Sequence, residues 1–109
     1  MVNYLIENTD EKIVGIGRSP EYHPIFLPYL YKKLRPLRFH FFQLDINKDL
    51  EKIFSLLDQE QPQAIYNFAA QGEVQHSWEH PDHWFKTNGL GIVNLVNGLR
   101  QRDYLKKYI

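Results

Sequence analysis

The spacing of hydrophobic residues changes several times along this chain and predicts alternating strands and helices. Val2, Leu5 and Ile6 are spaced as on one face of a helix, which ends near residue 8. The run "KIVGIG" at 12–17 is short and rich in β-branched residues, so it predicts a strand. The same patterns predict further strands at 38–45, 64–68 and from 106 onward, and helices at 25–34, 48–59 and from 82 or 83 onward.

Two of these helices have clear apolar faces, which are formed by Leu50, Ile53, Phe54 and Leu57 and by Ile92, Leu95, Val96 and Leu99. Residues 18–24 and 71–81 are expected to be loops. Strands that alternate with helices indicate βαβ units and a parallel sheet covered on both faces. Ligands of such sheets bind beyond the carboxyl ends of the strands. Here those ends are 17–19, 45–46 and 69–71, and we expect them to converge on one edge.

Composition narrows the possible partners and location of the chain. Its 109 residues suit one domain at most, and its 13 basic residues balance 13 acidic ones. This balance gives no reason to expect nucleic acid or an anionic membrane as a partner. There is no cysteine, no apolar run of membrane-spanning length and no signal-peptide pattern, so a cytoplasmic location is expected.

Several short motifs together resemble one enzyme family. They are "VGIGRS" at 14–19, "LDI" at 44–46, "YNFAAQGEV" at 66–74, "SWEHP" at 77–81 and "KTNGLG" at 86–91. The chain resembles the extended short-chain dehydrogenase/reductases, and among them the nucleotide-sugar 4,6-dehydratases acting on GDP-mannose or dTDP-glucose. The resemblance implies an α/β, Rossmann-like, doubly wound parallel sheet, with residues 1–109 as a partial NAD(P)-binding domain.

The resemblance also implies that this Rossmann domain is incomplete. Family members begin with a strand and a glycine-rich turn that holds the pyrophosphate, and neither is found here. Everything after the start of the fifth strand is also expected to be missing, including the catalytic Ser or Thr and the Tyr-x-x-x-Lys pair. Without the central first strand, the other four are expected to form two separate pairs. Tyr29 and Lys33 have the catalytic spacing, but they precede the alanine-rich strand and are rejected.

The resemblance assigns the adenosine end of the cofactor to the first two strand ends. Arg18 and Ser19 stand where the family contacts the adenosine ribose, and an Arg there accepts a 2′-phosphate. Because Gly17 replaces the acid that often binds a 2′-hydroxyl, NADP is slightly favoured over NAD; an exposed loop arginine is the alternative. Asp45 and Ile46 match the pair that meets adenine, although Asp45 also suits a helix N-cap.

The nicotinamide end is assigned to later residues by the same resemblance. Phe68, Ala69, Ala70 and Gln71 match the strand end that runs along the nicotinamide ribose and pyrophosphate, while tight packing of a helix on the sheet is the alternative. Gly72 stands where dehydratases commonly have a substrate-binding serine. Thr87 matches a position near the cofactor, and Asn88 matches one that interrupts helix hydrogen bonding to hold a water, unless both are ordinary surface residues. Gly89 and Gly91 are expected where the helix approaches the sheet closely.

The function implied for the parent protein is a transient oxidation at sugar C4, elimination of water across C5 and C6, and return of the hydride to C6. This chain would hold the dinucleotide and contribute no catalytic residue. The alternatives are a nucleotide-sugar 4-epimerase and a non-catalytic dinucleotide-binding or regulatory domain on the same fold. A homodimer is expected from the family. His76, His80 and His83, with Glu79 and Asp82, offer metal ligands, but Pro81 interrupts the helical spacing, so no metal site is predicted. A histidine-loop metal binder is the third and weakest alternative.

Overall fold

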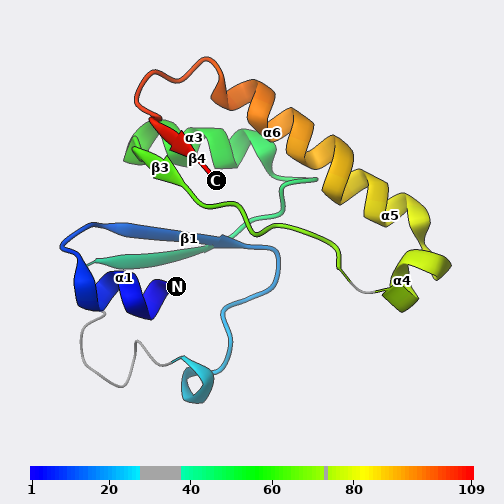
Figure 1. Cartoon of the computed structure of the whole chain (residues 1–109), viewed down its shortest axis with the longest axis horizontal. Coiled ribbons are helices and arrows are strands. Elements are labelled where there is room, and N and C mark those ends of the chain that lie inside the picture. The colour runs from blue at the N-terminus through cyan, green and yellow to red at the C-terminus, as the bar shows by residue number, and fades with distance from the viewer. Residues whose placement is uncertain (28–37, 73) are drawn as a thin grey trace. The chain divides into compact units, whose positions relative to one another are not determined.

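The structure is a computed structural model that describes residues 1–27, 38–72 and 74–109. The chain divides into two compact units, Met1–Leu44 and Asp45–Ile109, called here the first and second units (Figure 1). The helix predicted at 25–34 begins as a short 3-10 turn, η1 (Pro24–Phe26), and its remainder lies almost entirely outside the described residues. Tyr29 and Lys33 lie outside them as well.

The first unit contains one helix, α1 (Val2–Asn8), and two parallel strands, β1 (Ile13–Gly17) and β2 (Phe39–Gln43). Its core is formed by Ile6, Leu27 and Phe39, with Val2, Ile13 and Phe41 packed against them. Gly15 in β1 leaves room for the Phe39 ring, because a Cβ there would lie 2.9 Å from that ring. The apolar face predicted for residues 1–8 therefore packs against this strand pair.

Arg38 ties the end of α1 to the start of β2. Its guanidinium donates to the carbonyl of Ile6 at 2.8 Å and also to the carbonyl of Thr9, and it lies 3.6 Å from the Asp10 carboxylate. The last carbonyls of a helix have no partner within the helix and carry partial negative charge. The Arg38 guanidinium, 32 positions further along the sequence, thus provides a hydrogen-bond partner and a positive charge for the C-terminal turn of α1.

The second unit contains the other helices and strands of the described chain. They are α3 (Leu50–Glu60), β3 (Ala64–Ile65), α4 (Val74–Glu79), α5 (Pro81–Phe85), the π-helical turn η2 (Lys86–Gly91), α6 (Ile92–Leu99) and β4 (Lys107–Tyr108). Strands β3 and β4 are parallel. Among the described residues the strands thus form two separate pairs, β1–β2 and β3–β4, as predicted.

Helices α3 and α6 lie side by side in the second unit (Figure 1). Ile53 and Leu57 of α3 and Leu95 and Leu99 of α6 are buried, as their spacing predicts, and Leu56 is buried with them. The contact is close because Gly98 lies directly against the ring of Phe54. The guanidinium of Arg102 covers the same ring, with its carbon 4.3 Å from the ring centre.

The clearest differences from the sequence prediction lie between residues 64 and 82. The strand predicted at 64–68 ends at Ile65, and its continuation is bent by the Asn67 side chain, which accepts a hydrogen bond from the Ala69 N–H at 3.0 Å. The segment 71–81, predicted as a loop, contains α4. The next helix begins at Pro81, since proline lacks the N–H that the first helical turn leaves unpaired. Among the described residues, no helix is long and apolar enough to span a membrane.

Acid is expected to weaken the second unit through Asp58. Hydrogen bonds from Arg102 and Tyr104 hold the pKa of the Asp58 carboxyl below its ordinary value near 3.8. A lowered pKa in the folded state contributes stability above the ordinary pKa, and that stability is lost as the pH falls through the lowered value. Urea unfolding should be measured at pH 7 and below pH 4. Between these conditions Asp58→Asn should lose less free energy of unfolding than the unsubstituted protein does. An equal loss in Asp103→Asn and Asp58→Asn would contradict this role.

Candidate functional site

The turn of π-helix η2 lies between α5 and α6 and carries two of the residues singled out by sequence. Wider turns of this kind inside α-helices occur frequently at functional sites. Thr87 and Asn88 are both partly buried here, and each bonds to a different segment of the second unit. The interruption of α-helical hydrogen bonding predicted at Asn88 is present as this π-helical turn, while the water that it was expected to hold stays a prediction.

Asn88 holds the main chain of Gln71 through two hydrogen bonds. Its side-chain oxygen accepts from the Gln71 N–H at 2.7 Å, and its amide nitrogen donates to the Gln71 carbonyl at 2.9 Å. Both bonds are partly buried, so the pair satisfies backbone groups that water reaches poorly. Asn88 therefore fixes the end of the "FAAQ" segment against the helix.

Thr87 holds the segment that follows β2. Its hydroxyl accepts a hydrogen bond from the Asn47 side chain at 3.0 Å. The Asn47 N–H in turn donates to the Asp45 carboxylate at 2.8 Å, which closes a tight turn. The interpretation of Asp45 as a helix N-cap is wrong, because the N-cap of α3 is Asp49. The Asp49 carboxylate accepts from the Asp45 N–H at 3.1 Å, which adds a second bond to the turn.

Two glycines of η2 have different surroundings. A Cβ at Gly91 would lie 2.8 Å from the side-chain oxygen of Asn47 and 3.2 Å from a methyl carbon of Ile46. Gly91 was expected where the helix approaches the sheet closely. The close contact of Gly91 is instead with the segment after β2. The expectation for Gly89 is wrong, since a Cβ there would meet nothing within 4 Å.

The end of the "FAAQ" segment is open to solvent within the second unit. Phe68 is 74% exposed, and Ala69 and Ala70 are also exposed. Gly72 is exposed too, and a Cβ there would meet nothing within 4 Å. The alternative of tight helix-to-sheet packing at the two alanines is therefore wrong. Their small side chains leave a stretch of backbone accessible to a ligand.

Arg18 and Ser19 lie in the first unit, directly after β1, and both are exposed. The Gln43 side chain at the end of β2 donates to the Arg18 carbonyl at 3.2 Å. The ends of the two parallel strands thus lie together, as expected for neighbouring strands. The convergence of Arg18 with the segments of the second unit stays a prediction.

Asn47 is a site residue that the sequence reasoning missed. It bonds to Asp45 and also to Thr87, which is 40 positions further along the sequence. Its place two residues after an aspartate is a turn signal, which could have drawn attention to it. Its partner on the distant helix has no sequence signal.

The alternating helices and parallel strands, together with the solved structures to which the chain is similar, show a Rossmann-like α/β fold. The chain belongs to the GDP-mannose 4,6 dehydratase family, whose model matches residues 1–108. A curated relative, the dTDP-glucose 4,6-dehydratase of Xanthomonas campestris, is 41% identical over 51 residues, which are 47% of this chain and 14% of that protein.

Two solved structures match nearly the whole chain. The UDP-glucose 4-epimerase of Thermotoga maritima, determined with UDP-glucose, matches 98% of this chain and 31% of its own at 20% identity, with a TM-score of 0.74. The UDP-glucose 4-epimerase of Thermus thermophilus, in complex with NAD, matches 93% of this chain and 29% of its own at 22% identity, with a TM-score of 0.68. The chain thus spans under a third of the length of these proteins.

Proposed function

We propose that this chain binds the dinucleotide of a nucleotide-sugar 4,6-dehydratase that uses NADP or NAD. The observation that carries the proposal is the pair of neighbouring residues Thr87 and Asn88. Thr87 bonds to the segment after β2, and Asn88 bonds to the end of the "FAAQ" segment. By resemblance to the family, the segment after β2 is matched to the adenosine end of the dinucleotide and the "FAAQ" segment to its nicotinamide end. Both segments are held by the turn η2.

Asp45 suits the adenine of the cofactor. One of its carboxylate oxygens accepts from the Asn47 N–H, while the other has no hydrogen-bond partner among the described residues. A carboxylate oxygen accepts hydrogen bonds only, so it is complementary to the exocyclic amine of adenine. The turn closed by Asn47 fixes this carboxylate before the ligand arrives, which lowers the cost of binding.

The nicotinamide end is proposed to lie along Phe68, Ala69, Ala70 and Gln71. The exposed alanines leave the backbone accessible, and Asn88 keeps the Gln71 main chain in place. Gly72, which is exposed and has open space around it, is proposed to face the sugar nucleotide. Arg18 and Ser19 are proposed to contact the adenosine ribose, and the Arg18 guanidinium favours the 2′-phosphate of NADP.

Held by these residues in the complete enzyme, the dinucleotide would supply hydride chemistry, for oxidation at sugar C4 and for reduction at C6 after the loss of water. The residues of this chain bind and orient the dinucleotide and transfer no proton. The dehydratase is favoured over the epimerase because the family model and the 41% identical relative are both dehydratases. Incubation of the full-length protein with GDP-mannose and with dTDP-glucose distinguishes the two, since a dehydratase product has lost one water and an epimer has not.

The variant Asp45→Asn should weaken NADP binding by about tenfold, which corresponds to about 1.4 kcal/mol and to the loss of one hydrogen bond to a charged group. Asparagine can keep the turn with its side-chain oxygen, but it then presents an amide N–H to the amine of adenine. Calorimetric titration of the full-length protein with NADP and NAD measures the change.

The matched control is Asp103→Asn, which removes an exposed carboxylate from the same unit. It should leave the affinity for both dinucleotides unchanged, and NADP should bind the unsubstituted protein more tightly than NAD. Equal weakening in the two variants, or no binding of either dinucleotide to the full-length protein, would refute the proposed function.

A further inference from the structure

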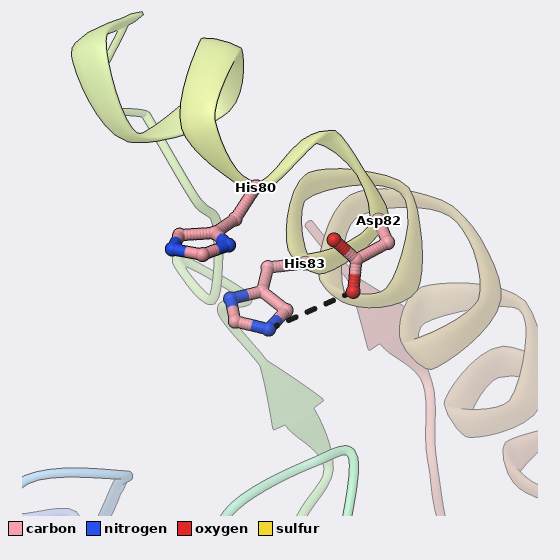
Figure 2. Close-up of side chains that lie close together, drawn as sticks. All are labelled: His80, Asp82 and His83. Atoms are coloured by element: carbon pink, nitrogen blue, oxygen red, sulfur yellow. Dashed lines mark ion pairs between the residues drawn. The ribbon is translucent and has the colours of Figure 1, made fainter.

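Three side chains of the types that bind metal ions gather where α4 meets α5. They belong to His80, Asp82 and His83, and all three are exposed (Figure 2). One ligand atom from each lies within 4.8 Å of the others. The two imidazole rings are stacked with their centres 5.0 Å apart, and the His83 ring lies 3.6 Å from the Asp82 carboxylate.

The proline that seemed to rule out a metal site creates this arrangement. The helical run is interrupted before Pro81, as predicted, since α4 ends at Glu79 and Pro81 begins α5 with His80 as its N-cap. The His83 N–H donates to the His80 carbonyl at 3.1 Å, which places the two histidines one turn apart. The side chain of His76, the third histidine of this segment, lies outside the described part of the structure.

We propose that His80, Asp82 and His83 bind a divalent transition-metal ion of the Zn²⁺ or Ni²⁺ class. Imidazole nitrogens and a carboxylate oxygen are ordinary ligands of such ions. The ligand atoms of a tetrahedral zinc ion lie about 3.4 Å apart, given bonds of about 2.05 Å. The distances between the three groups must therefore shorten by up to about 1.4 Å, a change that exposed side chains make by rotation about their own bonds. The remaining coordination positions face solvent and are left to water or to an external ligand.

Composition makes this cluster the strongest candidate among the described residues. The chain has no cysteine, so no thiolate competes for the metal, and it has five histidines. His23 and His40 lie in the first unit, in different elements, and His80 and His83 form the histidine pair of the one metal-compatible group found among the described residues. None of the three side chains takes part in the side-chain hydrogen bonds of Thr87 or Asn88, so metal binding and dinucleotide binding are tested with different variants.

The test is a calorimetric titration of the full chain, produced without a histidine tag, with Zn²⁺ and with Ni²⁺. The double variant His80→Gln/His83→Gln should bind at least tenfold more weakly, because two of the three ligands are gone. The control His40→Gln, an exposed histidine of β2, should bind like the unsubstituted protein. Trp84 follows His83 in α5, so Ni²⁺ should also quench tryptophan fluorescence, and the double variant should lose most of this quenching.

A single substitution shows whether the loss of metal binding in the double variant comes from misfolding. Asp82→Asn keeps both histidines and should still weaken Zn²⁺ binding several-fold, with the circular dichroism spectrum unchanged. Unaltered affinity in the double variant, equal losses in the double variant and His40→Gln, or no binding by the unsubstituted chain would each overturn the proposal.

Discussion

Replacing Asn88 with leucine should lower the free energy of unfolding by about 2–3 kcal/mol, since two partly buried backbone groups would lose their partners. Leucine has nearly the size and shape of asparagine, so it removes both hydrogen bonds to Gln71 with little change in volume. The N–H and the carbonyl of Gln71 would then remain poorly solvated. Urea denaturation followed by circular dichroism measures the loss.

Two companion variants separate the hydrogen bonds from other effects. Asn88→Asp keeps an acceptor for the Gln71 N–H but places a carboxylate oxygen against the Gln71 carbonyl, so its loss should be at least half that of leucine. Asn94→Leu makes the same substitution on the exposed side of α6 and should change stability by less than about 0.5 kcal/mol. Similar losses at Asn88 and Asn94 would show that the bonds to Gln71 contribute nothing.

The same variants bear on the proposed cofactor site. If Asn88 positions the end of the "FAAQ" segment for the dinucleotide, Asn88→Leu should weaken NADP binding under conditions where the variant is still folded. Asn94→Leu should not weaken it. The two readouts are separable, because stability is measured without ligand and affinity is measured well below the unfolding transition.

The order of elements followed from the sequence because it depends on local periodicity. Ile53 and Leu57 are buried at the spacing of a helical face, and the β-branched run at 13–17 forms a strand. The pairing of strands into two parallel pairs followed from the family's known strand order. These features could be predicted from the spacing of apolar residues or from the resemblance to a known family.

The contacts of the candidate site did not follow, because they join residues far apart in sequence. Asn47 and Thr87 are 40 positions apart, and Gln71 and Asn88 are 17 apart. A side-chain amide can accept a hydrogen bond from many groups and donate one to many others. Its partner is therefore decided by the tertiary structure. Helix α4 was also missed. It has only six residues, in a segment rich in polar side chains, and this is too short to show the periodicity of a helix.

Gly91 is expected to tolerate no larger residue, and Gly91→Val should cost about 2–3 kcal/mol of unfolding free energy through overcrowding. The new Cβ would come within 2.8 Å of the Asn47 oxygen and 3.2 Å of the backbone carbonyl of Lys86. Either Asn47 moves and its bond to Thr87 is lost, or η2 shifts away from the segment after β2. Both outcomes disturb the turn that holds Asp45, so NADP affinity should fall together with stability.

Gly89 gives the matched control, because it lies in the same turn with nothing within 4 Å of a new Cβ and no positive φ. Gly89→Ala should raise the free energy of unfolding by about 0.5–1 kcal/mol, since alanine loses less backbone entropy in a helix. The two substitutions should therefore shift the urea midpoint in opposite directions. If both destabilise equally, the cause is the π-helical backbone itself, and the close contact with Ile46 and Asn47 does not set the requirement for glycine at 91.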